Sequence, residues 1–205
     1  MKKKRIYLID FDGTITKEDT LTEIALSFYP KEAEIWWHKL QTGEYNIKNW
    51  LDSFKERFDI SEIKYKEFLR SLNIDETFQE FILSRDVRVV SGGFDYNIEK
   101  IFEKNRVENI KIYANNFKFI SENKIEIEMN YFNEKCGKCG VCKKNILEKY
   151  RKEYNEIVFI GDGITDICAA RFSDKIYAKK DSWLEKKLAE EGIEYTAFKS
   201  FLEVD

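Results

Sequence analysis

The stretch Asp10-Phe11-Asp12-Gly13-Thr14-Ile15-Thr16 begins where the apolar run Arg5–Asp10 ends in a carboxylate, and this junction decides the fold. A short, nearly continuous apolar run of this kind is typical of a strand buried on both faces of a parallel sheet. Side chains alternate along a strand, so we expect Asp10 and Asp12 to point the same way at its carboxyl end. Because open α/β sheets bind ligands at that edge, the sequence predicts a site there.

Three further runs resemble the first strand, namely Val87–Ser91, Ile157–Gly161 and Ile176–Ala178. Between them, apolar residues recur at helical spacing, and Gly192 stands where a glycine ends the last of these helices. Strand and helix in alternation predict an α/β fold with a Rossmann-like, doubly wound parallel sheet.

Residues 17–85 break the alternation and have the pattern of helices only. Four signals are expected to begin these helices: Thr20 with Glu23, Pro30, Ser61 and Asp75. We therefore predict a core made of residues 1–16 and 86–205, with residues 17–85 inserted as a helical cap. Between Ile110 and Tyr131 the pattern alternates instead, which predicts a β-hairpin at the edge of the sheet.

The composition excludes several classes of protein. The 205 residues suffice for one core with an inserted module, and 35 basic against 38 acidic residues leave a net charge of −3, without a nucleic-acid footprint. The basic start Met1–Arg5 precedes only four apolar residues, too few for a signal peptide, and no run is long enough to span a bilayer. We expect a cytoplasmic protein with no nucleic-acid or membrane partner, whose four cysteines are reduced thiols or metal ligands.

A second acidic motif, Ile160-Gly161-Asp162-Gly163-Ile164-Thr165-Asp166, also follows a buried strand. A lone Asp-x-Asp is most simply a solvated turn. Two acidic motifs that meet at one sheet edge instead form a site of hard oxygen ligands, and Mg²⁺ is the cation that fits carboxylates, water and phosphate oxygens.

At this point the chain resembles the haloacid dehalogenase superfamily of phosphatases, over its whole length. The motifs that carry the resemblance are Asp10–Thr14, Ser91 followed by Gly92 and Gly93, a lysine near position 143, and Gly161–Asp162 with Asp166. The helical insert is similar to the small C1-type cap of subfamily IB, which includes phosphoserine, methionine-salvage and phosphoethanolamine or phosphocholine phosphatases.

The resemblance implies a role for each motif. Asp10 would attack phosphorus, and Asp12 would act as general acid and then general base. Asp10, the backbone carbonyl of Asp12 and Asp162 would bind Mg²⁺, with Asp166 supporting the metal's surroundings. The remaining roles fall to three residues that would hold or neutralise the phosphoryl group: Ser91, Gly92 and the lysine of the third motif.

Periodicity does not choose between Lys143 and Lys144. The preceding loop, from Cys136 to Cys142, resembles the cysteine-rich loop of the methionine-salvage and the phosphoethanolamine or phosphocholine phosphatases. In those groups the lysine directly follows a cysteine, which favours Lys143.

The cysteines carry a hypothesis of their own. Cys136, Cys139 and Cys142, with Cys168, form a possible zinc site, although ordinary reduced thiols are the simpler interpretation. The single histidine, His38, lies far away in the cap and is interpreted as structural.

Two cap residues, Asp19 and Arg57, loosely resemble the acid and arginine with which phosphoserine phosphatases bind their substrate. Arg57 is otherwise a surface charge on an amphipathic helix. The tryptophans Trp36, Trp37 and Trp50 offer either a box for a choline-like cation or, as their helical spacing favours, packing.

The sequence thus predicts a Mg²⁺-dependent phosphomonoesterase of a small phosphorylated metabolite, acting through an aspartyl-phosphate. Its substrate is expected to be most like that of the methionine-salvage or the phosphoethanolamine or phosphocholine phosphatases, and phosphoserine is the alternative. The alternatives from another class are a catalytically silent domain of this fold and a zinc-stabilised binding domain.

Overall fold

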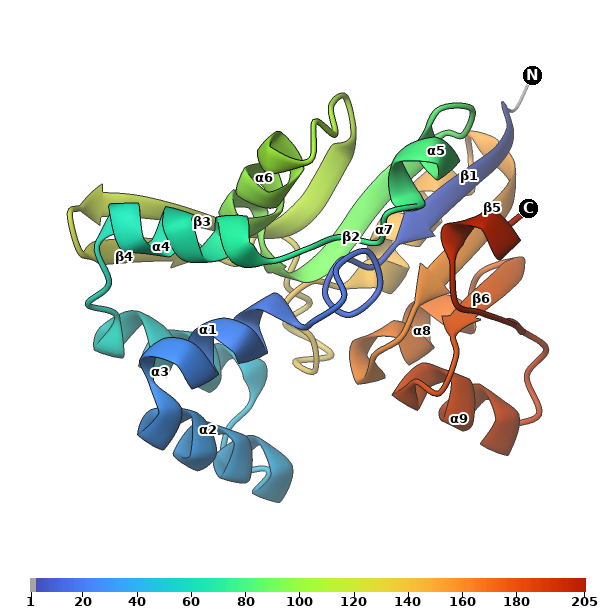
Figure 1. Cartoon of the computed structure of the whole chain (residues 1–205). Helices are drawn as coiled ribbons and strands as arrows, with labels where there is room; N and C mark the ends of the chain where they lie inside the picture. The colour runs from blue at the N-terminus through green and yellow to red at the C-terminus, as the bar shows by residue number, and fades with distance from the viewer. Residues whose placement is uncertain (1–2) are drawn as a thin grey trace.

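The structure, a computed structural model, describes residues 3–205, so Met1 and Lys2 of the basic start lie outside the described residues. Its strands form one sheet in the order β4-β3-β2-β1-β5-β6-β7 (Figure 1). The strands are β1 (Lys3–Ile9), β2 (Val87–Phe94), β3 (Lys111–Ser121), β4 (Lys124–Glu128), β5 (Tyr154–Gly161), β6 (Lys175–Lys179) and β7 (Thr196–Phe198). All neighbours pair in parallel except β3 and β4, which confirms the doubly wound parallel sheet.

The apolar run of β1 is continuous because both faces of this central strand are buried. Leu8 packs into one hydrophobic cluster, with Phe159 of β5, and Ile9 packs into the other, with Val89 of β2. The helices α6 (Asp95–Lys104) and α5 (Phe78–Ile82) contribute to the second of these clusters. The first contains residues of α7 (Lys143–Tyr150), α8 (Ile167–Ala170) and α9 (Trp183–Glu190). Gly192, at φ 66°, follows the end of α9 as predicted.

The predicted helical insert consists of α1 to α4, with α5 closing the segment. The helices are α1 (Thr20–Phe28), α2 (Pro30–Thr42), α3 (Ile47–Arg57) and α4 (Glu62–Ser71). α5 packs on the core, where Phe81 lies edge-on to Tyr7 of β1 with ring centroids 5.2 Å apart. The domain boundary at residue 85 stays a prediction.

Two of the predicted helix starts are wrong and two are confirmed. Pro30 is the first residue of α2, and Ser61 caps α4. The cap of α1, however, is Asp19, whose carboxylate accepts from the amide of Thr22, because the Thr20 hydroxyl is bonded elsewhere. The last helix, α5, begins only at Phe78, and the Asp75 carboxylate closes a turn by accepting from the Thr77 amide.

The predicted hairpin is present, at the edge of the sheet, but its first strand has a second role. The start of β3 pairs in parallel with β2, and only its later residues pair with β4. Aromatic side chains then join the hairpin to the cap: the Phe117 ring stacks on Tyr65 of α4 with centroids 5.2 Å apart. The short edge strand β7 was not predicted. No helix within residues 3–205 is long and apolar enough to cross a membrane.

Candidate active site

The two acidic motifs meet at one edge of the sheet. Asp10 follows β1 and Asp162 follows β5, and these strands are parallel neighbours, so their carboxyl ends lie side by side. One carboxylate oxygen from each of Asp10, Asp162 and Asp166 lies within 4.8 Å of the others. The central expectation from the sequence, acids from distant stretches gathered at a common edge, therefore holds in the structure.

Asp10 is buried and held by two donors. The Phe11 amide donates to its Oδ1 over 2.8 Å, and Lys143 Nζ lies 2.6 Å from the same oxygen. Lys143 also lies 2.5 Å from Asp166 Oδ1, so its ammonium bridges both acids. Burial, and then the Asp166 charge, raise the pKa of Asp10 well above its usual value. Burial works against the Lys143 ammonium, but Asp10 and Asp166 outweigh it and keep the pKa of Lys143 above its ordinary value.

Asp162 and Asp166 are fixed by donors from both motifs. The Thr14 hydroxyl donates to Asp162, while Asp166 Oδ2 accepts from the amides of Asp162 and Gly163 over 3.0 and 2.8 Å. With Lys143 on its other oxygen, Asp166 has both oxygens engaged. Burial and the Asp166 charge raise the pKa of Asp162 to about 6.

The close approach of the motifs requires glycine at position 13. Gly13 has φ 77°, and a Cβ built on it would lie 2.5 Å from Asp162 Oδ2. Any other residue would be strained in that backbone conformation and would push the second motif away.

Asp12 stands in a different setting from Asp10. Its Oδ1 accepts from the Thr20 amide over 3.1 Å and from the Thr20 hydroxyl, and its Oδ2 accepts from the Ser91 hydroxyl over 3.0 Å. Burial and the nearby Asp19 charge raise the pKa of Asp12 to about 6. The carboxyl group is thereby able to exchange a proton near neutral pH.

The acids fit a hard divalent cation. Asp10, Asp162 and Asp166 bring three negative charges to one place, and Lys143 offsets only one of them. The raised pKa values of Asp10 and Asp162 express this repulsion and the cost of burying charge. A cation with oxygen ligands removes both costs, and carboxylates are the ligands that Mg²⁺ prefers.

A cavity of about 420 Å³ opens over these acids. Acidic and glycine residues of the motifs line its floor, and apolar side chains line much of the rest. The apolar lining residues are Leu21 of α1, Ile47 of α3, Ile164 of the second acidic motif, and Trp183 of α9. Asp19 and Gly92 also line this cavity, and their expected roles in binding substrate and phosphate stay predictions. The cap and the core thus both contribute to its walls.

The structure does not bring the other predicted cap residue to the cavity. Arg57 pairs with Glu32 over 2.7 Å and with Asp59 over 2.9 Å, and its guanidinium lies over the Tyr29 ring. The tryptophans also pack rather than form a box. Trp36 and Trp50 are buried in the cap, with ring centroids 6.2 Å apart.

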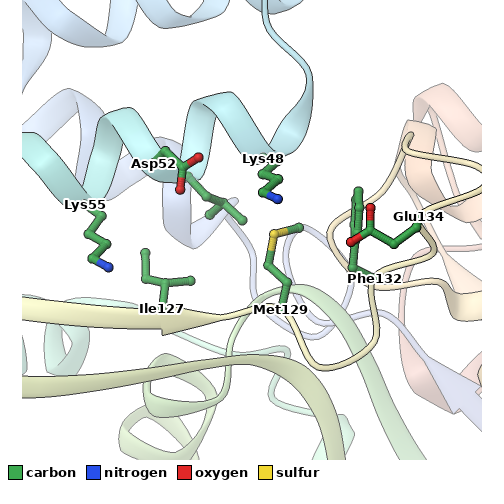
Figure 2. A pocket seen from close by; sticks show the side chains of 8 residues that line it. Lys48, Asp52, Lys55, Ile127, Met129, Phe132 and Glu134 are labelled. Atoms are coloured by element: carbon green, nitrogen blue, oxygen red, sulfur yellow. The ribbon is translucent and has the colours of Figure 1, made fainter.

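A second cavity, of about 240 Å³, lies between the cap and the hairpin. Figure 2 shows Lys48, Asp52 and Lys55 of α3 above Ile127 and Met129. None of the predicted site residues lines it, so it plays no part in the chemistry described above.

Sequence reasoning missed three supporting residues. Thr14 and Thr20 position Asp162 and Asp12, and the buried Asn115 of β3 donates from Nδ2 to the Gly92 carbonyl over 2.8 Å. Thr14 lies within the first motif, and Asn115 is a polar residue inside a buried part of a strand, so both could have been identified from the sequence. Thr20 left none, because its hydroxyl was expected to cap a helix.

A parallel sheet of this topology, with these acids, this lysine and a helical cap, is the arrangement of phosphatases of the haloacid dehalogenase type. The model of the family described as Putative Phosphatase matches residues 5–200, and the chain belongs to this family, whose members are phosphoric monoester hydrolases.

Curated relatives and solved structures agree with this assignment. The chain is 31% identical to the 2-hydroxy-3-keto-5-methylthiopentenyl-1-phosphate phosphatase of Bacillus pumilus (strain SAFR-032), over 98% of this chain and 90% of that protein. It is 27% identical to the enzyme of the same name from Brevibacillus brevis (strain 47), over 100% and 95%. A phosphoserine phosphatase, solved as a phospho-aspartyl intermediate analogue, is 25% identical with a TM-score of 0.73, over 98% and 97%.

Proposed function

We propose that this phosphatase hydrolyses a small phosphorylated metabolite in two steps, through an aspartyl-phosphate on Asp10 and with Mg²⁺ in the acidic cluster. The observation that carries the proposal is the position of Asp10, which lines an open cavity together with Asp162 and pairs with the buried Lys143. The similar phosphoserine phosphatase, solved as an analogue of such an intermediate, supports the same chemistry.

In the first step Asp10 attacks phosphorus and the ester P–O bond breaks. Lys143 and the Phe11 amide both hold Oδ1 of Asp10, which leaves Oδ2 to attack. Asp12 gives its proton to the leaving oxygen. In the second step Asp12 takes a proton from water, the water oxygen attacks the phosphorus, and inorganic phosphate leaves while the Asp10 carboxylate is restored.

The residues that would hold Mg²⁺ are Asp10, the backbone carbonyl of Asp12, and Asp162. Both oxygens of Asp166 are already engaged by Lys143 and by backbone amides, so Asp166 is better suited to support than to bind directly. When bound, the ion would neutralise charge on the transferring phosphoryl group.

Phosphate binding falls to Ser91, Gly92 and Lys143. Ser91 sits 3.0 Å from Asp12 and accepts from the Gly93 amide over 2.8 Å, so its hydroxyl is fixed next to the proposed acid. Gly92 lines the cavity, and its carbonyl is anchored by Asn115. The Lys143 charge offsets the charge that builds up on the phosphoryl oxygens.

The cavity favours a substrate with an uncharged or cationic body over an amino acid. Leu21, Ile47 and Trp183 offer apolar contact, Asp19 offers a carboxylate for a cation, and no basic side chain is among the described residues that line this cavity. The curated relatives are named for 2-hydroxy-3-keto-5-methylthiopentenyl-1-phosphate, whose body is uncharged and ends in a methylthio group. We therefore propose a substrate like theirs, or like phosphoethanolamine or phosphocholine.

A panel of phosphate esters with Mg²⁺ tests this function. We expect release of inorganic phosphate to require Mg²⁺, to stop with a chelator and to return when Mg²⁺ is added in excess. Among the esters, kcat/KM should be highest for a small substrate with an apolar or cationic body. Turnover that persists at the same rate in the chelator would contradict the proposed metal site, because the acids would then have to work unneutralised.

Phosphoserine is the alternative substrate, and a substitution of Arg57 distinguishes it from phosphoethanolamine. If Arg57 bound the serine carboxylate, Arg57→Gln would lower kcat/KM for phosphoserine but not for phosphoethanolamine. We expect both values to stay within about twofold of the parent, because Arg57 is engaged by Glu32 and Asp59 and an exposed pair contributes only about 0.2–1 kcal/mol. A selective loss on phosphoserine would restore the alternative.

A further inference from the structure

The cysteines gather around a cavity of their own. Cys136, Cys139 and Cys142 come from the loop before α7, and Cys168 comes from α8, yet all four line one cavity of about 260 Å³. This cavity adjoins the one above the acids, since Thr165 lines both. The four are free thiols in the structure, so the gathering is not a disulfide framework.

The spacing of the sulfurs does not suit a single ion. Four sulfurs bound at about 2.3 Å to one tetrahedral zinc lie roughly 3.8 Å from one another. Among residues 3–205, the acids Asp10, Asp162 and Asp166 are the only group of three or more potential ligands whose atoms fall within 4.8 Å of one another. Three cysteine sulfurs therefore never come that close, although all four residues face the same cavity. This spacing is compatible with an occupant that holds the sulfurs farther apart than a single ion does.

We propose that Cys136, Cys139, Cys142 and Cys168 bind a [4Fe–4S] cluster. In such a cluster each thiolate binds a different iron at the corner of a cube, so the sulfurs are held farther apart than around one ion. The sequence supplies the matching pattern, three cysteines spaced Cys-x-x-Cys-x-x-Cys and a fourth from a distant part of the chain.

The surroundings suit a partly exposed anionic cluster. Asn133 donates from Nδ2 to Cys142 Sγ over 3.7 Å, and hydrogen bonds to the sulfurs are one means by which proteins tune such clusters. Lys138 brings a positive charge to the cavity, and Phe172 provides an apolar wall.

A cluster here would brace the phosphatase site without taking part in its chemistry. Cys142 immediately precedes Lys143, and Cys168 lies two residues after Asp166. Lys143 and Asp166 are themselves joined over 2.5 Å. The cluster would therefore tie together the two chain segments that position this ion pair, which makes the cysteines positioning residues.

The test is the iron and sulfide content of the full-length chain, purified without oxygen or reconstituted with ferrous iron and sulfide. We expect about four irons and four acid-labile sulfides per chain. The protein should be brown, and reduction with dithionite should produce an electron paramagnetic resonance signal. None of these readouts depends on phosphatase activity, so the proposal can fail while the proposed function stands, and the reverse.

Variants assign the ligands. Cys139→Ala and Cys168→Ala should each retain less than about a tenth of the parent iron and sulfide, because a lost ligand opens one corner of the cluster. Lys135→Ala, an exposed change in the same loop, should retain all of it. Circular dichroism of each variant separates loss of the cluster from loss of the fold. The proposal is overturned by stoichiometric zinc, by iron without sulfide, by a disulfide, or by four free thiols without metal in the parent protein.

Discussion

Asp10→Asn is expected to lower phosphate release by more than about 10⁴-fold, which is beyond the loss that removal of a general acid or base causes. The amide keeps the shape of the side chain but is a poor nucleophile, so no aspartyl-phosphate can form. The measurement is hydrolysis of p-nitrophenyl phosphate with Mg²⁺, alongside Asp52→Asn, which changes an exposed acid of α3 and should keep the parent rate.

The same variant has an expected effect on stability, and its direction is unusual. Burial and Asp166 raise the pKa of Asp10, and an acid whose pKa is higher in the folded protein destabilises the fold at any pH above its unfolded value. In Mg²⁺-free buffer at neutral pH, Asp10→Asn should therefore melt no lower than the parent. An inactive variant that melts lower would leave misfolding as the cause, and a variant active at the parent rate would disprove the covalent mechanism.

The parts of the fold that the sequence predicted are those where one interaction dominates. The central strands are apolar throughout because both faces are buried, as Leu8 and Ile9 show, so their pattern is unambiguous. The cap of α1 was misassigned because the Thr20 hydroxyl has two competing partners, a backbone amide of its own helix and the Asp12 carboxylate. A threonine hydroxyl can cap a helix or donate to a distant carboxylate. Only the folded chain shows that the Thr20 hydroxyl and amide both donate to Asp12.

In the candidate site, the residues placed by the sheet could be predicted from the sequence, and the partners of the cap residues could not. Asp10, Asp162 and Asp166 follow two neighbouring parallel strands, so the topology of the sheet brings them together, and Asp12 lines the cavity above them. Arg57 sits on a helix of the cap, where its partners depend on how that helix packs, and its engagement by Glu32 and Asp59 left no mark in the spacing. The surroundings of such cap residues could therefore be found only from the structure.

Lys143→Met is expected to lower the free energy of unfolding by about 3–5 kcal/mol in Mg²⁺-free buffer, the usual cost of removing one partner from a buried ion pair. Lys143 is buried between Asp10 and Asp166, and methionine fills similar space without the charge. Urea unfolding measures the loss. Hydrolysis measured at saturating Mg²⁺ should also fall sharply, because the variant lacks the positive charge that would offset charge on the phosphoryl group.

Lys144→Met is the matched control, because the adjacent side chain is partly exposed, pairs with the exposed Glu148 at 3.7 Å and lies over the Phe172 ring. It should unfold within about 1 kcal/mol of the parent, since exposed ion pairs and exposed cation–π contacts contribute no more than that. The electrostatic account also requires opposite signs from the two partners of one ion pair: losing the Lys143 charge destabilises the fold, while losing the Asp10 charge does not. If both changes destabilised the protein equally, packing rather than the excess of buried negative charge would govern this site, and the argument for a bound cation would lose its basis.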